Sequence, residues 1–344
     1  MAITSLRLQN FTVFEDFEMN LSPGINVIIG ENGTGKTHLL KAIYSFCECE
    51  IGVASDCDAW VTDFGAKISE CFRVDSLHEL HNNNRDSGLY ADGIVVSFTT
   101  KNKPDPYEMW FRNNAVEMYL SPNKNKKRPG SSMYIPSKDM LTHARGLLTM
   151  AGKYSRDMPF DKTLLDIIQS ADNWKLDEVP KLAEAIIPKL EKVIDGMIVQ
   201  QDGEFFVLKS NGDKIRFSCE AEGVKKFGLL WQLLMTGAIE ENSVLLWDEP
   251  EANVNPKLIP ILVDILIEFA RHGVQVFIAS HDYFLPQYSD VLATKSDNVA
   301  FHSLYKTDNG VMCETRDKFS LIANNSIIDE KIRLYDKEVD KVLS

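Results

Sequence analysis

The feature that most constrains this chain is the segment Gly30–Thr37, whose sequence GENGTGKT fits the pattern G-x-x-x-x-G-K-[ST] at every fixed position. The apolar run Ile25–Ile29 before it predicts a buried strand, and the apolar spacing of His38–Phe46 after it predicts a helix. A glycine-rich turn between a strand and a helix points its backbone N–H groups inward, where they bind phosphate oxygens. The segment therefore predicts a nucleotide-binding site.

The residues of this loop have separate expected roles. Lys36 is expected to reach the β- and γ-phosphates of ATP, and the hydroxyl of Thr37 is expected to hold Mg2+. The other members supply the tight turn and backbone N–H groups. The predicted nucleotide-binding residues are Gly30, Glu31, Asn32, Gly33, Thr34, Gly35, Lys36, Thr37 and His38.

Two carboxylates follow an apolar run in the later part of the chain. Val244–Trp247 is apolar and leads directly into Asp248 and Glu249. Because ligands of parallel sheets bind at the carboxyl ends of the strands, both side chains are candidates for the same site. Asp248 is expected to support Mg2+, and Glu249 to act as the general base that activates the attacking water. A strand that ends in a solvated acidic turn is the alternative.

A histidine follows another predicted strand. The mostly apolar run Val274–Ala279 leads into Ser280 and His281. Beside a γ-phosphate, the imidazole of His281 can donate a hydrogen bond and respond to the nucleotide state. Taken alone, a histidine in this position is more often structural. The order of the three motifs makes His281, with Glu249, a candidate catalytic residue.

Composition and charge narrow the classes of partner. The content of 44% hydrophobic and 25% charged residues is ordinary for a soluble protein, and no run approaches the ~20 apolar residues of a membrane span. No signal peptide is visible, so we expect a cytoplasmic protein without a membrane partner. The net charge of −13 opposes general attraction to nucleic acid. The basic run Lys124–Arg128 leaves a nucleic-acid contact open.

Six cysteines in 344 residues are too few to predict a disulfide framework. Four of them lie between residues 47 and 71, and His78 and His81 follow, so a zinc site is one interpretation. No C-x-x-C or H-x-x-x-H pair is present, however. Reduced, partly buried cysteines are the favoured interpretation.

The strand and helix patterns divide the chain into three parts. Residues 1–140 are expected to hold the phosphate loop and antiparallel strands, and residues 141–222 a helical lobe with a small β meander. Residues 223–344 return to alternating strands and helices, which predicts a mainly parallel sheet and an α/β fold. Residues 47–90 are expected to be irregular after the first helix. The tail Asn324–Ser344 reads as one amphipathic helix, expected to dock on its own sheet rather than on a partner.

Several segments together match one group of ATPases. They are Leu6–Phe11, Gly30–Thr37, Tyr134–Asp139, Leu245–Glu251 with Asn255 and Pro256, Ser280–His281, Asn325–Glu330 and Leu334–Asp336. In these segments the chain resembles the ABC-type ATPases of the SMC, RecF and OLD group, and more narrowly the compact AAA-family ATP-binding proteins of bacterial defence loci. The resemblance implies a P-loop NTPase fold with a mainly parallel sheet, an antiparallel β subdomain and an inserted helical lobe. Lys36 and Asp248 are 212 residues apart, which leaves room for that lobe.

The resemblance also implies that two protomers face each other head to tail and enclose two ATP molecules. Each site is then completed by a signature segment at a helix N-terminus of the other protomer. The best match to that segment is Ala221, Glu222, Gly223 and Lys225. The group normally has serine where this chain has Ala221, and the expected glutamine near Ser137 and Lys138 is missing. Both departures predict slow, switch-like hydrolysis.

The expected function is an ATP-driven dimerisation switch, a homodimer or a higher even oligomer, that controls a separate effector protein or a nucleic acid in phage defence or DNA repair. The 63 residues after His281 are too few for the metal-dependent nuclease of OLD proteins, so none is expected. A DNA-binding repair ATPase of the RecF kind is the main alternative, which the acidic charge disfavours. A small-molecule or nucleotide kinase is a third, which Glu249, His281 and the long insertion disfavour.

Overall fold

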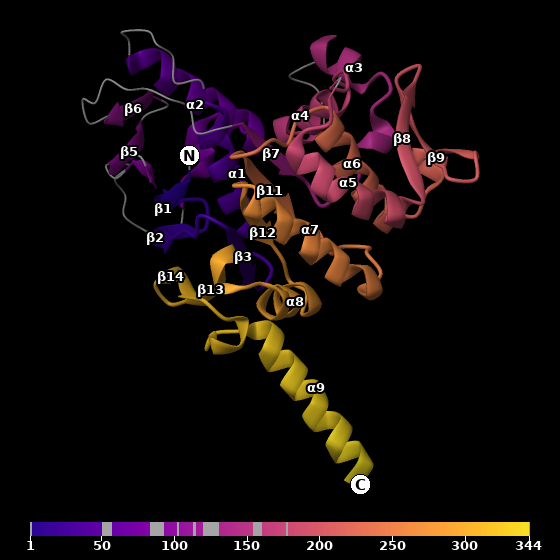
Figure 1. Cartoon of the computed structure of the whole chain (residues 1–344). Coiled ribbons are helices and arrows are strands. Elements are labelled where there is room, and N and C mark those ends of the chain that lie inside the picture. Colours follow the sequence, from indigo (N-terminus) through magenta and orange to yellow (C-terminus); the bar gives the residue numbers. More distant parts are fainter. Residues whose placement is uncertain are drawn as a thin grey trace.

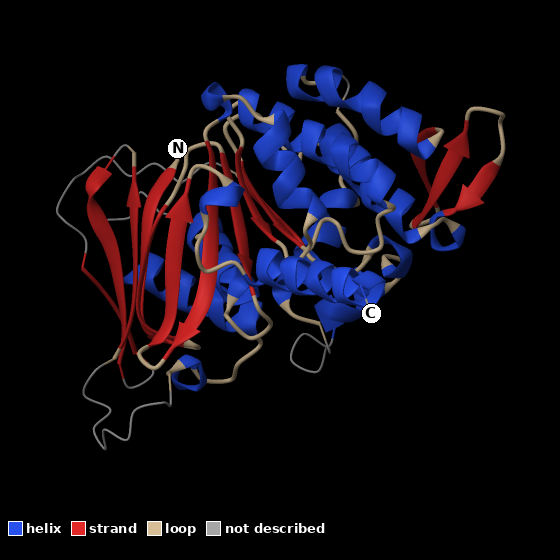
Figure 2. Ribbon diagram, turned by 90° about the horizontal axis from the view of Figure 1, so that it is seen from below, coloured by secondary structure: helices blue, strands red, loops and turns tan. Residues whose placement is uncertain are grey.

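A computed structural model describes residues 2–49, 57–82, 93–101, 103–112, 115–119, 131–153, 160–176 and 178–343. Within these residues the strands form a six-stranded, a five-stranded and a three-stranded sheet (Figures 1 and 2). None of the described helices is both long enough and apolar enough to span a bilayer.

The six-stranded sheet carries the candidate site and has the order β14-β13-β3-β12-β11-β7. All neighbours are parallel except the edge strand β14, which runs antiparallel to β13, so the predicted mainly parallel sheet is confirmed. The register pairs Asp248 with Ala279, and Ala279 with Ile28, which brings the carboxyl ends of three strands side by side. The strands are β3 (Ile25–Gly30), β7 (Ser132–Ile135), β11 (Val244–Asp248), β12 (Gln275–Ala279), β13 (Val299–Thr307) and β14 (Gly310–Arg316).

The five-stranded sheet is antiparallel throughout, with the order β2-β1-β4-β5-β6. Its strands are β1 (Ile3–Phe11), β2 (Phe14–Asn20), β4 (Ile94–Thr100), β5 (Lys103–Arg112) and β6 (Ala115–Tyr119). The two antiparallel strands predicted near the N-terminus are therefore confirmed. The two residues between β5 and β6, Asn113 and Asn114, and the basic run Lys124–Arg128 lie outside the described residues.

Helix α1 (Lys36–Glu48) lies between these two sheets and fixes the phosphate loop against both. Leu39, Leu40 and Ile43 are fully buried in the shared core. Phe46 stacks on Phe98 of the five-stranded sheet with 4.2 Å between the ring centroids. The other side of this core is formed by residues such as Ile28, Leu246 and Phe277 of the six-stranded sheet. Because close packing holds α1 from both sides, its N-terminus is a rigid platform.

The expectation that residues 47–90 are irregular is wrong, because α2 spans Cys57–Phe72. Phe64, Ile68 and Cys71 of this helix are fully buried, at helical spacing. The sequence conceals the helix because Gly65 and the β-branched pair Val61 and Thr62 have low intrinsic helix propensity. Packing against the core overrides that local preference.

A helical lobe lies on the other side of the molecule from the five-stranded sheet (Figure 1). Its elements are α3 (Leu147–Lys153), α4 (Lys162–Ala171), α5 (Lys181–Ile194), α6 (Glu222–Met235), and the antiparallel strands β8 (Gly196–Gln201), β9 (Glu204–Lys209) and β10 (Lys214–Arg216). Helix α6 packs along α5 and on β8. The indole N–H of Trp231 donates to Glu191 across this contact at 3.1 Å. The division of the chain at residues 140 and 222 stays a prediction.

Two further helices flank the six-stranded sheet, α7 (Ile259–Arg271) and α8 (Phe284–Leu292). Helix α7 has apolar residues on most of its surface, and Leu262, Val263 and Leu266 are buried in a core with β3, β11 and β12. With α1 on one face and α7 on the other, both faces of the parallel sheet are covered. This double coverage explains the almost unbroken apolar sequences of β11 and β12.

The C-terminal helix α9 (Ser326–Leu343) extends away from the body of the molecule (Figure 1). Only its first turns make core contacts, through the half-buried Ile327 and Ile328. Ile332 is 54% exposed, Tyr335 64% and Val342 84%. The predicted helix is confirmed, but the expectation that it docks along its own sheet is wrong. The physical reason is that other elements already cover both faces of that sheet.

Candidate nucleotide-binding site

The phosphate loop joins the end of β3 to the start of α1. Gly35, directly before the helix, has a φ of 89°, a conformation that favours glycine. A Cβ atom at Gly35 would lie 2.6 Å from side-chain atoms of both Val13 and Phe14, so no larger residue fits there. The first N–H groups of α1 have no partner within the helix, and its dipole adds positive potential at this end. The loop thus has the geometry of a phosphate site.

Lys36 folds back over the loop. Its ammonium donates hydrogen bonds to the carbonyl oxygens of Gly30 at 2.6 Å and Glu31 at 3.0 Å. Burial lowers the pKa of Lys36, and the nearby carboxylates, Asp248 first among them, oppose that shift. Anionic phosphate oxygens bind an ammonium more strongly than neutral carbonyl oxygens do. Lys36 is therefore placed to exchange these carbonyls for phosphate.

The two residues predicted to hold Mg2+ contact each other. The hydroxyl of Thr37 donates to Asp248 Oδ2 at 2.8 Å, and the phenol of Tyr134 donates to the same oxygen at 3.3 Å. Burial raises the pKa of Asp248. A hydroxyl beside a carboxylate suits Mg2+, which proteins usually bind through one or two carboxylates together with phosphate and water. The donor set therefore fits Mg2+ next to a phosphate chain.

Glu249 and His281, the two candidate catalytic residues, also meet. His281 Nδ1 lies 3.2 Å from Glu249 Oε1. The two residues follow the ends of β11 and β12, and the backbone N–H of Glu249 donates to the carbonyl of Ala279 at 2.9 Å. Glu249 has a φ of 50°, a left-handed conformation that few residues with a side chain adopt. The side chain of Glu249 is 33% exposed and that of His281 is 53% exposed, so both are open to a ligand.

Glu251 helps to position Glu249 and His281. Its carboxylate is buried, and it accepts a hydrogen bond from the Ser280 hydroxyl at 2.7 Å and from the His281 backbone N–H at 3.4 Å. Burial raises the pKa of Glu251. The carboxylate thus ties the turn after β11 to the turn after β12, and so fixes the position of His281 relative to Glu249.

His38, the last predicted nucleotide-binding residue, has its side chain directed toward α2. Its ring lies edge-on to Phe72, with 5.4 Å between the centroids. Burial lowers the pKa of His38. Its Nδ1 is buried without a hydrogen-bond partner in the described part of the chain. The part of His38 that remains to bind phosphate is its backbone N–H, in the first turn of α1.

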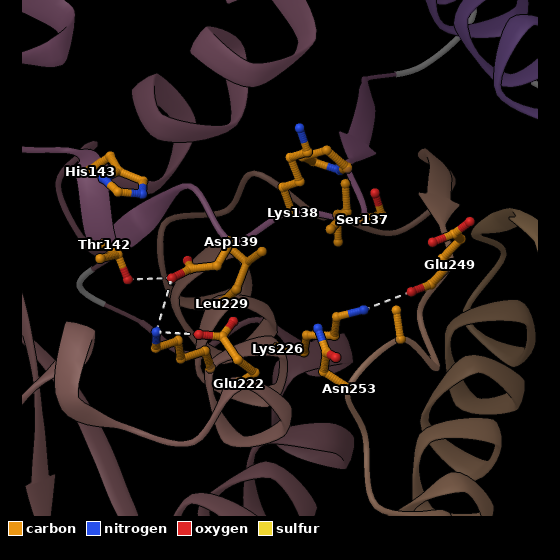
Figure 3. Close-up of a pocket in the computed structure, with 14 residues that line it drawn as sticks. Ser137, Lys138, Asp139, Thr142, His143, Glu222, Lys226, Leu229, Glu249 and Asn253 are labelled. Atoms are coloured by element: carbon orange, nitrogen blue, oxygen red, sulfur yellow. Dashed lines mark hydrogen bonds and ion pairs between the residues drawn. The ribbon is translucent and has the colours of Figure 1, made fainter.

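The signature segment lies apart from the phosphate loop of its own chain. Ala221 precedes α6 and makes no side-chain cap, and Lys225 is paired with Glu222 at 2.7 Å and Asp139 at 3.5 Å. A cavity of about 500 Å3 separates this segment from Glu249 (Figure 3). Ser137 and Lys138, where the glutamine is missing, line the same cavity, and none of residues 30–38 does. The structure therefore brings together the phosphate loop, Asp248, Glu249 and His281. Glu222 and Lys225 of the signature segment line the cavity instead, Ala221 precedes α6, and Gly223 packs against the backbone of Asn253.

Lys226 bridges that cavity. Its ammonium donates to the backbone carbonyl of Glu249 at 2.6 Å (Figure 3). It also donates to that of Pro250 at 3.3 Å. Burial lowers the pKa of Lys226 to about 8. The first turn of α6 is thus attached to the backbone of the candidate base.

The described residues contain no cluster of three or more histidine, cysteine, aspartate or glutamate side chains that could hold a metal ion. Cys47, Cys49 and Cys71 have buried thiols. The sequence-based interpretation of reduced cysteines stays a prediction.

Known proteins match the chain at the level of family and fold. Residues 1–139 match the family described as "AAA ATPase domain", and residues 142–285 the family described as "AAA domain, putative AbiEii toxin, Type IV TA system". The fold is similar to that of an SMC head bound to the C-winged helix domain of ScpA, with a TM-score of 0.61 and 13% identity over 92% of this chain and 98% of that one. It is also similar to the SMC head domain from Thermotoga maritima, with a TM-score of 0.53 and 12% identity over 92% and 100% of the two chains. Both matched families are AAA ATPase domains, so the chain is an AAA ATPase, and its fold is that of the SMC heads.

Curated relatives carry the description "DNA replication and repair protein RecF". The protein of Chlamydia abortus is 54% identical over 44 residues, which are 13% of this chain and 12% of the relative. The protein of Photorhabdus laumondii is 24% identical over 212 residues, which are 54% of this chain and 56% of the relative. The chain spans 12% of the length of the first of these relatives and 56% of the second. An ATPase of this group binds a nucleotide, and anything more specific is a proposal.

Three residues of the site were not predicted from the sequence. Tyr134 contacts Asp248, Lys226 contacts Glu249, and Lys306 Nζ lies 3.5 Å from the position of a Cβ atom on Gly33. Tyr134 reaches Asp248 because the register of β7 and β11 pairs it with Leu246, two residues before Asp248, and this register is visible only in the structure. Nothing in the local sequence marks Lys226 or Lys306.

Proposed function

We propose that this ATPase binds Mg2+-ATP between residues 30–38 and the ends of β11 and β12, and hydrolyses it slowly. The observation that carries the proposal is the meeting of Thr37 with Asp248 and of Glu249 with His281 beside Lys36. These side chains come from three strands that are distant in sequence. A purely structural role would not require them at one open edge of the sheet.

The proposed roles follow from the chemistry of each group. Lys36 and the N–H groups of the loop bind the phosphates, and Thr37 and Asp248 hold Mg2+, which neutralises charge on the phosphate oxygens. Glu249 accepts a proton from the attacking water, and His281 donates a hydrogen bond toward the γ-phosphate while it contacts Glu249. Glu251 and Ser280 keep His281 in place.

We further propose that ATP joins two copies head to tail, with the Ala221–Lys225 segment of each copy against the γ-phosphate bound by the other. The segment begins α6, so its N–H groups and dipole favour an anion. Gly223 packs closely within its own chain, because a Cβ atom there would lie only 3.0 Å from the carbonyl oxygen of Asn253. The absent hydroxyl at Ala221 removes one contact to the γ-phosphate, which favours slow turnover.

The dimer is proposed to act in the cytoplasm as a switch on a separate effector protein in anti-phage defence. Support comes from the resemblance to compact ATPases of defence loci and from the match to a family described as a putative AbiEii toxin of a type IV toxin–antitoxin system. The neighbouring gene is the natural source of the effector. The experiment that identifies it is co-purification of the two gene products with and without ATP.

The dimer proposal is tested by light scattering of the purified chain with Mg2+-ATP, with Mg2+-ADP and with ATP plus EDTA. We expect the mass to double only with Mg2+-ATP, together with slow release of phosphate. A chain that binds no ATP would contradict the proposed function as a whole. A chain that binds ATP and remains monomeric would contradict only the dimer.

A RecF-like DNA-binding repair ATPase is the second candidate, favoured by the curated relatives. DNA affinity measured at several salt concentrations tests it, because each phosphate contact makes binding weaken as salt rises. Tight binding with a steep salt dependence would support this candidate. Binding that is absent even at low salt would reject it.

A further inference from the structure

The β13–β14 hairpin extends alongside the phosphate loop. Strand β13 pairs in parallel with β3, and the register places Leu304 opposite Gly30, the last residue of β3. Strand β13 continues for three more residues, to Thr307. Its end therefore lies beside the first half of the loop, where β3 itself has already turned away.

Lys306 is the residue of this extension that faces the loop. Side chains alternate along a strand, so Lys306 lies on the same face as Leu304. Leu304 is fully buried in the core that contains Leu39 and Leu40 of α1. Lys306 therefore points to the side of the sheet on which α1 begins, and its Nζ lies 3.5 Å from the position of a Cβ atom on Gly33.

The ammonium of Lys306 has no ion-pair partner among the residues that the structure describes. The side chain is exposed, and it forms no ion pair or hydrogen bond within the part of the chain that the structure describes. The chain has 50 acidic and 37 basic residues, so carboxylates are plentiful elsewhere. Lys36, the other ammonium at the loop, is engaged with two carbonyls in this ligand-free arrangement.

The hairpin that carries Lys306 is held in place at its tip. A Cβ atom on Gly310 would lie 3.2 Å from Cγ of Glu15, at the start of β2, so the tip packs against the five-stranded sheet. The hydroxyl of Thr307 donates to the carbonyl of Gly310 at 2.9 Å, which closes the turn. The position of Lys306 beside the loop is therefore set by packing on both sides of the hairpin.

We propose that Lys306 is a further ATP-binding residue, whose ammonium contacts the phosphate chain from outside the loop. The inference rests on the proposed ATP site. The flexible four-carbon stem of lysine allows the ammonium to move onto the ligand without a change in the backbone. Because the group is exposed, salt screens the contact strongly. Lys306 thus increases the affinity for ATP of a site in which Lys36 already binds the phosphates.

The test compares Lys306→Ala and Lys306→Arg with a control, Lys295→Ala, in the intact chain. Lys295 is an exposed lysine just before β13, whereas Lys306 lies near the other end of that strand, so the control removes the same charge far from the loop. ATP affinity is measured by titration calorimetry at low and at high salt. We expect Lys306→Ala to weaken ATP binding about five- to tenfold at low salt, with a smaller difference at high salt. Lys306→Arg and Lys295→Ala should stay within about twofold of the parent chain.

Two results would overturn the inference. One is an unchanged ATP affinity of Lys306→Ala at low salt. The other is a loss that persists at high salt together with a lower melting temperature, because that pattern indicates damage to the hairpin rather than a missing charge. Lys36→Ala serves as the reference for the site itself. If the parent chain binds no ATP, the proposed function fails; if Lys36→Ala loses binding and Lys306→Ala does not, only this inference fails.

Discussion

The hydroxyl of Thr37 donates a hydrogen bond of 2.8 Å to Asp248, a residue 211 positions later in the chain. The contact joins the first turn of α1 to the carboxyl end of β11. It places the hydroxyl and the carboxylate that we propose to hold Mg2+ at one point before any ligand arrives. Such preorganisation lowers the cost of ordering side chains when Mg2+-ATP binds.

Lys36→Ala is expected to weaken ATP binding by at least about 100-fold, because it removes the buried ammonium that faces the phosphates. Titration calorimetry measures the affinity, and Lys295→Ala is the control for loss of one positive charge. The fold should remain intact, since Lys36 contacts only loop carbonyls. An affinity within tenfold of the parent chain would show that the loop is not the phosphate site.

Glu249→Gln is expected to bind ATP normally and to reduce phosphate release by about 100-fold or more, because an amide cannot accept the proton of the attacking water. The ATP-bound dimer should then accumulate, which light scattering detects. Glu241→Gln, at an exposed position outside the site, is the matched control. Normal turnover by Glu249→Gln would mean that another group is the base.

Asp248→Asn is expected to raise the melting temperature of the ligand-free chain at pH 7. Burial raises the pKa of Asp248, so the folded chain binds this proton more tightly than the unfolded chain does. The stabilising effect is fully present below the ordinary aspartate pKa, and it is lost as pH rises through the raised value. The difference in melting temperature between the variant and the parent chain should therefore disappear at acidic pH. Thermal unfolding measured at several pH values tests this. In the same variant, the affinity for ATP should no longer depend on Mg2+. A melting temperature at pH 7 that is lower than that of the parent chain would contradict the expected stabilisation.

Ala221→Ser and Ala221→Asp separate helix capping from phosphate binding. Both side chains can cap α6, so both should stabilise the fold by about 1 kcal/mol. Only the serine should strengthen the ATP-dependent dimer, because an aspartate at that point repels the γ-phosphate bound by the other copy. Dimer dissociation constants measured in ATP distinguish them. Equal effects of the two variants on dimerisation would argue against contact between this segment and the nucleotide.

Removal of residues after Lys331 is expected to change the free energy of unfolding by less than about 1 kcal/mol, because α9 has no buried residue. Ile327→Asp is the contrasting variant, since Ile327 contacts the core. Chemical denaturation measures both. A large loss on truncation would mean that the exposed part of α9 has a stabilising contact.

The parts of the site that lie in short motifs could be predicted from the sequence. The loop Gly30–Thr37, Asp248, Glu249 and His281 each follow a strand with a strong apolar pattern, and the rule that parallel strands present ligands at their carboxyl ends brings them together. The pattern alone could not give the side-chain direction of His38. That depends on α2, whose Gly65 and β-branched residues conceal the helix.

Strand β13 was not predicted because polar residues interrupt its buried face. His302 and Ser303 are almost fully buried, and His302 is within hydrogen-bond distance of Asn26 at 3.1 Å and Thr315 at 2.9 Å. Burial lowers the pKa of His302 to about 3, so the ring stays neutral in the core. These contacts exist only in the folded chain, so no local pattern reveals the strand. Lys306 could not be placed at the loop without it.

The neighbours of β3 have a consequence for synthesis of the protein on the ribosome. Strand β3 is complete after thirty residues, but its partners β12 and β13 are made only about 250 residues later. A growing chain therefore contains the phosphate loop long before β12 and β13 exist. Until they are made, no neighbouring strand of the six-stranded sheet holds β3 in place. Cellular ATP can stabilise only molecules in which β12 and β13 have already been made. Nascent fragments should be open to chaperones and proteases until that moment, after which nucleotide capture favours the completed product.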